Sequence, residues 1–178
     1  MAELQSNRRL VSNLDYIHSS QFRFLITKLP TVEYFVTSVN LPQISLSGEA
    51  EINTPFKEIS LGGDTVIYED LSVEFLVDED LKNWLEVYEW IQGIGFPESR
   101  GKQYSDTLAN SVSFPQSIYS EAKLILLTNK SNPNIEITFQ EVYPSSLSGL
   151  QFTTQETDMN VLKATAEFKF LNTTIVRL

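Results

Sequence analysis

The chain has 178 residues, of which 42% are apolar, 20% charged and 11% aromatic. This composition suffices for the core of a single globular domain, and it is too aromatic and too weakly charged for a disordered protein. The chain has no cysteine, and its only histidine is His18. A disulfide framework, a thiolate nucleophile and a multi-histidine zinc site are therefore excluded.

The net charge of −10 is concentrated in one stretch of the sequence. Between Glu49 and Glu89 there are 12 acidic and 2 basic residues, whereas the rest of the chain is balanced. We expect neither tight nucleic-acid binding nor adsorption to anionic membranes, because phosphates and anionic lipids both repel an acidic chain. An acidic face that merely keeps the protein soluble explains the bias equally well.

The N-terminal half predicts an arm, several strands and a long hairpin. Residues 1–20 are polar with scattered apolar positions, and we expect them to form an N-terminal arm. Residues 49–65 alternate without a clear core face, which predicts an extended, exposed hairpin. Strands are predicted, in chain order, over residues 21–28, 32–40, 44–47 and 68–77. The last of these is the clearest, because Leu71, Val73, Phe75 and Val77 share one face.

One helix is predicted over residues 80–92. Its apolar residues form a single stripe at helical spacing, and we expect that stripe to face the core: Leu81, Trp84, Leu85, Tyr88 and Ile91. Trp90 lies off the stripe. It is therefore a candidate subunit contact, although a place beneath the following loop is an equal alternative.

The C-terminal half predicts a long loop followed by strands. Residues 98–119 lack periodicity and are long for a connection in a compact domain, so we expect this segment to be functional, ordered by a partner or mobile. Tyr104, Leu108 and Phe114 are the candidate contacts in this loop. Strands are predicted over residues 121–129, 135–143, 150–154 and 161–176. Residues 21–178 thus predict one mainly β domain, an antiparallel sandwich or barrel of two sheets with a flanking helix and a protruding hairpin.

No catalytic or metal-binding pattern stands out. Asp78-Glu79-Asp80 lacks the glycine that a calcium loop requires at its sixth position and better explains a solvated helix start. His18 has no nucleophile or orienting group at a defined spacing, and Glu86 and Glu89 lie on the polar face of the predicted helix. We therefore expect neither an enzyme nor a cofactor or metal site.

The order of these elements resembles the tail tube proteins of contractile-tailed, myovirus-type bacteriophages over Gln21 to Phe170. No single motif is diagnostic, and the resemblance rests on the ordered set. Its pieces are a strand at Phe22–Thr27, an aromatic strand ending in Val39-Asn40-Leu41-Pro42, a hairpin ending in Gly62-Gly63-Asp64, a strand at Leu71–Phe75, the helix with Trp84 and Trp90, and the segment Glu141–Phe152 before a closing strand.

The resemblance implies a structural virion protein that is assembled in the host cytoplasm. It implies six-membered rings, with neighbouring sheets paired edge to edge, that stack into a hollow tube inside a contractile sheath. DNA would pass through this tube without sticking to it. Implied partners are further copies of the chain and the sheath, baseplate and terminator proteins, and no membrane is involved.

Two groups of residues acquire roles from this resemblance. The hairpin would reach the adjacent ring, which makes its residues candidates for an inter-ring contact: Glu49, Glu51, Ile52, Phe56, Lys57, Glu58 and Ile59. Glu69, Asp70 and Glu74 are candidate acids facing the lumen, where negative charge would repel passing DNA.

Three alternatives remain open at this point. The long loop and residues 171–178 depart from shorter family members, which leaves room for a tube-initiating baseplate protein or a terminator of the same fold. A tube protein of a non-phage contractile injection system is the second alternative. The third is a small β-rich hydrolase or carbohydrate-binding module, with Tyr16, Tyr104 and Tyr119 as stacking residues.

Overall fold

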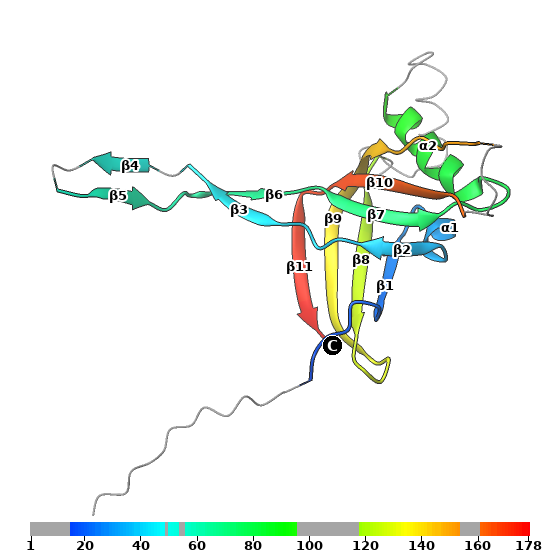
Figure 1. The fold of residues 1–178 in the computed structure, drawn as a ribbon, viewed down its shortest axis with the longest axis horizontal. Coiled ribbons are helices and arrows are strands. Elements are labelled where there is room, and N and C mark those ends of the chain that lie inside the picture. The colour runs from blue at the N-terminus through cyan, green and yellow to red at the C-terminus, as the bar shows by residue number, and fades with distance from the viewer. Residues whose placement is uncertain (1–14, 49, 54–55, 96–117, 154–160) are drawn as a thin grey trace, which may run out of the picture.

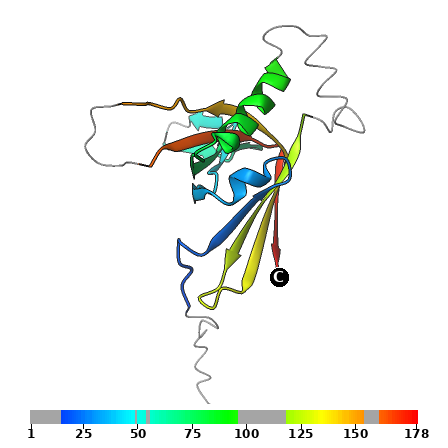
Figure 2. The same cartoon turned by 90° about the vertical axis from the view of Figure 1, so that its right-hand side faces the viewer.

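The computed structural model describes residues 15–48, 50–53, 56–95, 118–153 and 161–178. It confirms the predicted class: the fold is mainly β, with two antiparallel sheets and a helix packed against them (Figures 1 and 2). The sheets form a sandwich and do not close into a barrel. Glu49, Tyr104, Leu108 and Phe114 lie outside the described residues.

Sheet A contains four strands in the order β1, β8, β9 and β11. Their bounds are Phe22–Ile26 for β1, Ser120–Leu127 for β8, Pro133–Leu147 for β9 and Asn172–Arg177 for β11. All of their pairings are antiparallel. Strand β11 continues the chain just after β10 and lies along the first half of β9 (Figure 1).

Sheet B contains the second half of β9, followed by β10 (Lys163–Lys169), β7 (Leu71–Leu76) and β2 (Val36–Val39). Strand β9 therefore belongs to both sheets. The strand changes sheets near Glu141, whose φ of 55° lies in a region that non-glycine residues seldom occupy. This left-handed residue gives a local cause for the bend, as bulged residues often do.

The core lies between the two sheets. In β7 the predicted alternation is confirmed: Leu71, Val73 and Phe75 are fully buried, and the residues between them are half-buried. Phe139 on the sheet A part of β9 and Phe168 on β10, the neighbour of β7 in sheet B, are also fully buried. Figure 2 shows the α2 helix (Lys82–Gly95) beside sheet B and the short α1 helix (Pro30–Glu33) between β1 and β2.

A long two-stranded arm projects from the end of sheet B (Figure 1). Its inner part pairs β3 (Ile44–Ser47) with β6 (Thr65–Tyr68), and its outer part pairs β4 (Ala50–Asn53) with β5 (Glu58–Leu61). The hairpin predicted over residues 49–65 is thus present. Its paired part begins earlier and ends later than predicted, because the 44–47 segment joins it instead of forming a separate strand of the body.

Three predicted strands need correction. Residues 32 and 33 of the 32–40 prediction belong to α1, because Pro30 at the first helical position favours a helical turn. Residues 150–153 form no strand, since β9 continues to Leu147 and supplies the sheet edge instead. The 161–176 segment is two strands, β10 and β11, which lie in different sheets.

The buried face of α2 also differs from the prediction. Asn83, Val87 and Trp90 are its buried residues, whereas Leu85 and Tyr88 are 41% and 40% exposed. The helix is apolar on two sides, so spacing alone could not select the inner one. Asn83 can be buried because both polar atoms of its side chain form hydrogen bonds. Its Nδ2 donates to the Leu76 carbonyl at 2.7 Å, and its Oδ1 accepts from two backbone amides.

Candidate assembly surfaces

The inner arm carries an apolar face that is largely left open by the described part of the chain. Ile44 is paired with Tyr68 and Leu46 with Val66, which places these four side chains on one side of the ribbon. Ile44 is 61% exposed and Leu46 57% exposed. An isolated two-stranded ribbon is marginal in water, so this face is suited to burial against another molecule.

Aromatic contacts join the arm to the core at its base. The Tyr68 ring lies 5.3 Å from the ring of Phe170, which in turn lies 5.1 Å from the ring of Phe139. Phe139 is fully buried between the sheets. The arm is therefore anchored to the body through a continuous row of rings, although its own apolar face is open.

Gly63 allows the close approach of the two arm strands where the paired parts meet. A Cβ atom at this position would lie 2.1 Å from the Ser47 carbonyl oxygen, which is a severe overlap. The sequence motif Gly62-Gly63-Asp64 is therefore explained by local backbone packing within the arm. The motif links β5 to β6 along one side of the arm and does not form a turn that reverses the chain.

The predicted inter-ring residues lie on the outer arm. Phe56 is 97% exposed, and Glu51 and Lys57 are also exposed. Ile52, Glu58 and Ile59 belong to the paired strands β4 and β5, but the structure does not describe their side chains. The role of these residues in an inter-ring contact stays a prediction.

Trp90 lies in the core of this chain. It is 9% exposed, and its Nε1 donates to the Ile118 carbonyl at 2.8 Å. Lys28 Nζ lies 5.0 Å from the ring centroid, and partial burial lowers the pKa of this lysine. Of the two alternatives for Trp90, the place beneath the end of the following segment fits these contacts, so little of its surface is left for a second subunit.

The three candidate lumen acids differ in their surroundings. Glu74 accepts a hydrogen bond from Lys163 Nζ at 2.8 Å, which holds the pKa of its carboxyl below the usual value. Asp70 is half-buried, with Ser145 Oγ at 3.5 Å, and Glu69 is exposed. Because Lys163 offsets Glu74, the surface of sheet B around β7 and β10 is less acidic than the sequence suggests. Whether these acids face a lumen stays a prediction.

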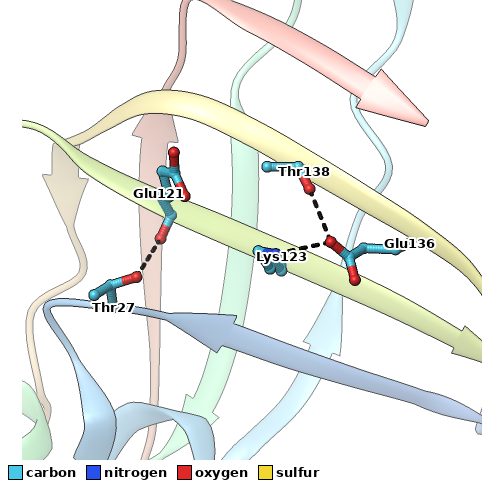
Figure 3. Close-up of polar contacts among 5 residues, drawn as sticks. All are labelled: Thr27, Glu121, Lys123, Glu136 and Thr138. Carbon is cyan, nitrogen blue, oxygen red and sulfur yellow. Dashed lines mark hydrogen bonds and ion pairs between the residues drawn. The ribbon is translucent and has the colours of Figure 1, made fainter. Parts of the chain in front are cut away.

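The outer face of sheet A carries polar side chains that are paired with one another (Figure 3), beside the apolar Leu25, Ile125 and Val176. Glu136 Oε1 lies 2.8 Å from Lys123 Nζ and 3.3 Å from Thr138 Oγ1. The ion pair lowers the pKa of Glu136 and raises that of Lys123. At the β1 end, Thr27 Oγ1 donates to the Glu121 carbonyl at 3.5 Å. Lys123 and Glu136 are therefore already partnered within the chain.

The two sheets have four open edge strands. Two of these pair with their inner neighbours in an unbroken register, and the other two are interrupted. In sheet A, β1 and β11 pair with their inner neighbours without any shift in register. In sheet B, the register of β2 shifts between Val36 and Ser38, and the second half of β9 contains Pro144. Bulges and proline make an edge less suitable for pairing with another chain. The local sequence pattern does not distinguish these edges.

Within the described part of the chain, no three acidic, histidine or cysteine side chains come close enough to hold a metal ion. Among the same residues, no helix combines the length and apolarity that a membrane crossing requires. The surfaces that stand out are therefore the arm and the regular edges of sheet A.

A family model described as phage tail tube protein matches residues 4–175, nearly the whole chain. The chain belongs to this family. Its members are structural proteins of the tail, which supports the expectation that the chain is not an enzyme. The recognised resemblance to tail tube proteins is confirmed at this level, whereas a role as the main tube subunit is not.

A tail tube terminator protein of Enterobacteria phage T4 is 29% identical over 139 residues, covering 75% of this chain and 72% of that protein. Two solved structures share the fold at low identity. The tube-terminating cap of the anti-feeding prophage has a TM-score of 0.62 at 14% identity and covers 98% of this chain and 100% of that one. The PVC sheath/tube terminator has a TM-score of 0.54 at 13% identity, with coverages of 92% and 99%.

Proposed function

We propose that this tail tube family member is a tail tube terminator, a protein whose ring binds the end of a phage tail tube. The observation that carries the proposal is the sequence match to the T4 terminator, which spans most of both chains. The sequence analysis ranked the main tube subunit first and the terminator as an alternative. The comparisons favour the alternative.

The ring in this proposal is a closed set of identical subunits, with six copies as the working number. A closed ring requires two different patches on each subunit that fit one another, and binding to a tube end requires a third. The regular edges of sheet A are candidates for the first two patches. The arm, with its uncovered apolar face, is the candidate for the third.

The proposal includes a contractile tail with a sheath, in a virion assembled in the host cytoplasm, and passage of DNA through the ring. The net charge of −10 on each subunit supports weak contact with DNA, because a basic lining would hold it by counterion release. Glu69, Asp70 and Glu74 remain the candidate lumen acids. A map of the electrostatic potential in an assembled ring tests this part, and a net basic bore would contradict it.

Negative-stain electron microscopy of the purified protein separates the terminator from the main tube subunit. We expect discrete rings of uniform diameter that do not grow into rods at high protein concentration. Addition of the protein to growing tail tubes should shorten them, with rings at one end. Rods formed by this protein alone would identify it as a main tube subunit, and a strictly monomeric protein would contradict both roles.

The arm contact is tested by replacing Glu51–Ser60 with Asn-Gly. Ala50 and Leu61 are already paired, so a two-residue turn can close the shortened hairpin. We expect the body to fold with unchanged stability and binding to tube ends to be lost. The matched control is Lys130→Ala, which removes an exposed lysine from the turn between β8 and β9, away from the arm. Unimpaired binding of the shortened variant would show that the outer arm is not the tube contact.

A further inference from the structure

The outward face of the α2 helix carries an exposed apolar patch. Tyr88 follows Leu85 by three positions and Trp84 by four, so these three side chains are neighbours on the helix surface. Leu85 is 41% exposed and Tyr88 is 40% exposed, on a helix that lies beside sheet B and buries its other side (Figure 2). We call Trp84, Leu85 and Tyr88 the α2 patch.

The two aromatic rings of the α2 patch are held in place by contacts within the chain. They stack with 15° between their planes and 5.2 Å between their centroids. Trp84 Nε1 donates to the Ser148 carbonyl at 3.2 Å, and Gln92 Nε2 donates to the Tyr88 hydroxyl. Rings that are already fixed lose little conformational entropy on binding, so they are suited to anchoring a partner.

Acidic residues surround the α2 patch. From Asp78 to Gln92 the chain has five acidic residues and one basic residue, which is a net charge of −4. Glu79 and Glu89 are exposed. The basic residue, Lys82, forms an ion pair with Asp80 at 2.6 Å. A molecule that covers this face must therefore bring positive charge to match it.

We propose that the α2 patch is a docking site for a basic amphipathic helix of another protein. The apolar stripe of that helix packs across Leu85 and Tyr88, and its lysine or arginine side chains reach Glu79 and Glu89. The site is separate from the arm and from the edges of sheet A. The inference therefore goes beyond the terminator role and does not depend on it.

The surface of α2 has the shape that a second helix requires. Trp84, Tyr88 and Gln92 are spaced by four positions and form one ridge, and Leu85 and Glu89 form the next. A ridge of side chains on another helix fits into the groove between two such ridges. The partner helix would thus lie on Leu85 and Tyr88 with its charged side toward the acidic residues.

The aromatic rings also favour a cationic partner. Lysine and arginine bind the faces of indole and phenol rings, and they bind carboxylates as well. The chain shows such a contact on the same helix, where Lys28 Nζ lies 5.0 Å from the centroid of the Trp90 ring. A basic side chain from the partner can use Tyr88 in the same way.

The proposal explains why α2 is more apolar than its packing requires. Of the five residues in its apolar stripe, Trp84 and Ile91 pack against the core. Leu85 and Tyr88 are left largely outside, where they contribute little to folding. Contact with a partner gives these two side chains a use that the fold of the single chain does not.

Charge and position decide between the other possible occupants. A second copy of the α2 patch and DNA are both disfavoured, because like charges would meet. Residues 1–14 include Arg8 and Arg9 and are a basic segment of this chain. They join the described chain at Asp15, however, which lines a hollow at the β8–β9 turn, at the end of the body opposite α2 (Figure 1).

A pair of synthetic peptides tests the charge preference. Each is about 18 residues long, enough for a helix, with a leucine stripe on one face and either lysine or glutamate on the other. Fluorescence anisotropy measures the binding of each labelled peptide to the full-length protein. We expect the lysine peptide to bind at least tenfold more tightly than the glutamate peptide, with an affinity that falls as salt is added.

Substitutions locate the binding on α2. Leu85→Ser with Tyr88→Ser should weaken binding of the lysine peptide at least tenfold. The matched control is Leu41→Ser with Tyr34→Ser, which removes the same two residue types from exposed positions elsewhere. Glu79→Lys with Glu89→Lys should reverse the preference between the peptides, whereas Glu51→Lys with Glu69→Lys, at exposed positions off the helix, should not. If the serine variant does not fold, the charge variants still decide the question.

Tryptophan emission gives a second readout of the same site. The chain has two tryptophans, and the peptides have none. Trp84 lies in the α2 patch and Trp90 in the core, so binding should move the emission to shorter wavelength through Trp84 alone. The shift should vanish in Trp84→Phe, which keeps an aromatic ring at this position.

The remaining outcomes overturn the proposal. These are a lysine peptide that does not bind, equal binding of the two peptides, and equal losses in the serine variant and its control. Binding that appears only after residues 1–14 are deleted would assign the patch to the chain's own basic segment. Loss of rings in the serine variant would make the patch an interface between copies. Since peptide binding does not require a ring, a parent protein without rings overturns the terminator role and leaves this site standing.

Discussion

The body and the arm of this protein are built from the same kind of antiparallel pairing, but only the body has a second layer. In β7 every second residue is fully buried, because sheet A lies across from it. In the arm, Ile44 and Leu46 alternate in the same way and remain more than half exposed. The apolar area of the arm therefore contributes little to folding in the single chain, and it is available for assembly.

The largest effect should come from the core of the body. Phe75→Ala removes a fully buried ring and leaves a cavity between the sheets. We expect it to lower the free energy of unfolding by about 3–5 kcal/mol. Chemical denaturation of the monomer measures this loss, and Tyr34→Ala, at an 85% exposed position, is the control. A loss below about 1 kcal/mol would mean that the core is not packed as described.

Asn83 should give the next largest effect. Its side chain bonds the Leu76 carbonyl and the backbone amides of Asp78 and Trp84, which ties the start of α2 to the end of β7. Asn83→Ala leaves these groups without their partner, and we expect a loss of about 1–3 kcal/mol. Asn172→Ala, at an exposed edge, is the matched control, and equal losses in both variants would contradict this role of Asn83.

The Glu74–Lys163 pair should contribute less. Its atoms are 2.8 Å apart, but the side chains are 35% and 57% exposed, so solvent screens the attraction. Since the folded state lowers the pKa of Glu74, its contribution is present above the ordinary carboxyl pKa and is lost as the pH falls through the lowered value.

We therefore expect Glu74→Gln to cost less than about 1 kcal/mol at neutral pH, with the difference from the parent disappearing in acid. Urea denaturation at several pH values measures it. A difference that persists when the carboxyl is protonated would show that shape, and not charge, is responsible.

The arm should show the smallest effect on stability and a large one on assembly. Leu46→Ser with Val66→Ser makes the apolar face of the ribbon polar. Because this face is open in the single chain, we expect a change in unfolding free energy of about 0.5 kcal/mol or less. Binding to tube ends should nevertheless be lost. Thr65→Ser on the opposite side is the control, and a strongly destabilised double variant would show that the arm is part of the body's fold.

Much of the body could be predicted from local pattern. Alternation in β7 identified its buried face, and acidic residues before an apolar helical segment located α2. The predicted face of α2 was right in part, because Trp84 and Ile91 pack against the core. Tyr88 instead lies exposed and stacks on Trp84, with ring centroids 5.2 Å apart, while the polar Asn83 faces inward. Helical spacing counts apolar residues, and it does not detect a buried amide whose hydrogen bonds come from distant backbone.

Of the candidate assembly surfaces, one could be predicted from local pattern and the other could not. The arm was predicted because its residues alternate without a marked core face. The edges of sheet A were not distinguished, since the regularity of β1 and β11 depends on strands far away in the sequence.

The sequence alone determined that this protein is a β sandwich with one helix and a projecting hairpin, because alternation, helical spacing and turn residues act over a few positions. The order of the predicted elements along the sequence also sufficed to recognise the tail tube family. Only the tertiary structure decided which helix face is buried, where β9 changes sheets and which edges stay open and regular. Those features follow from which strands become neighbours, and paired residues of neighbouring strands lie up to 104 positions apart in the sequence, as Phe22 and Leu126 do.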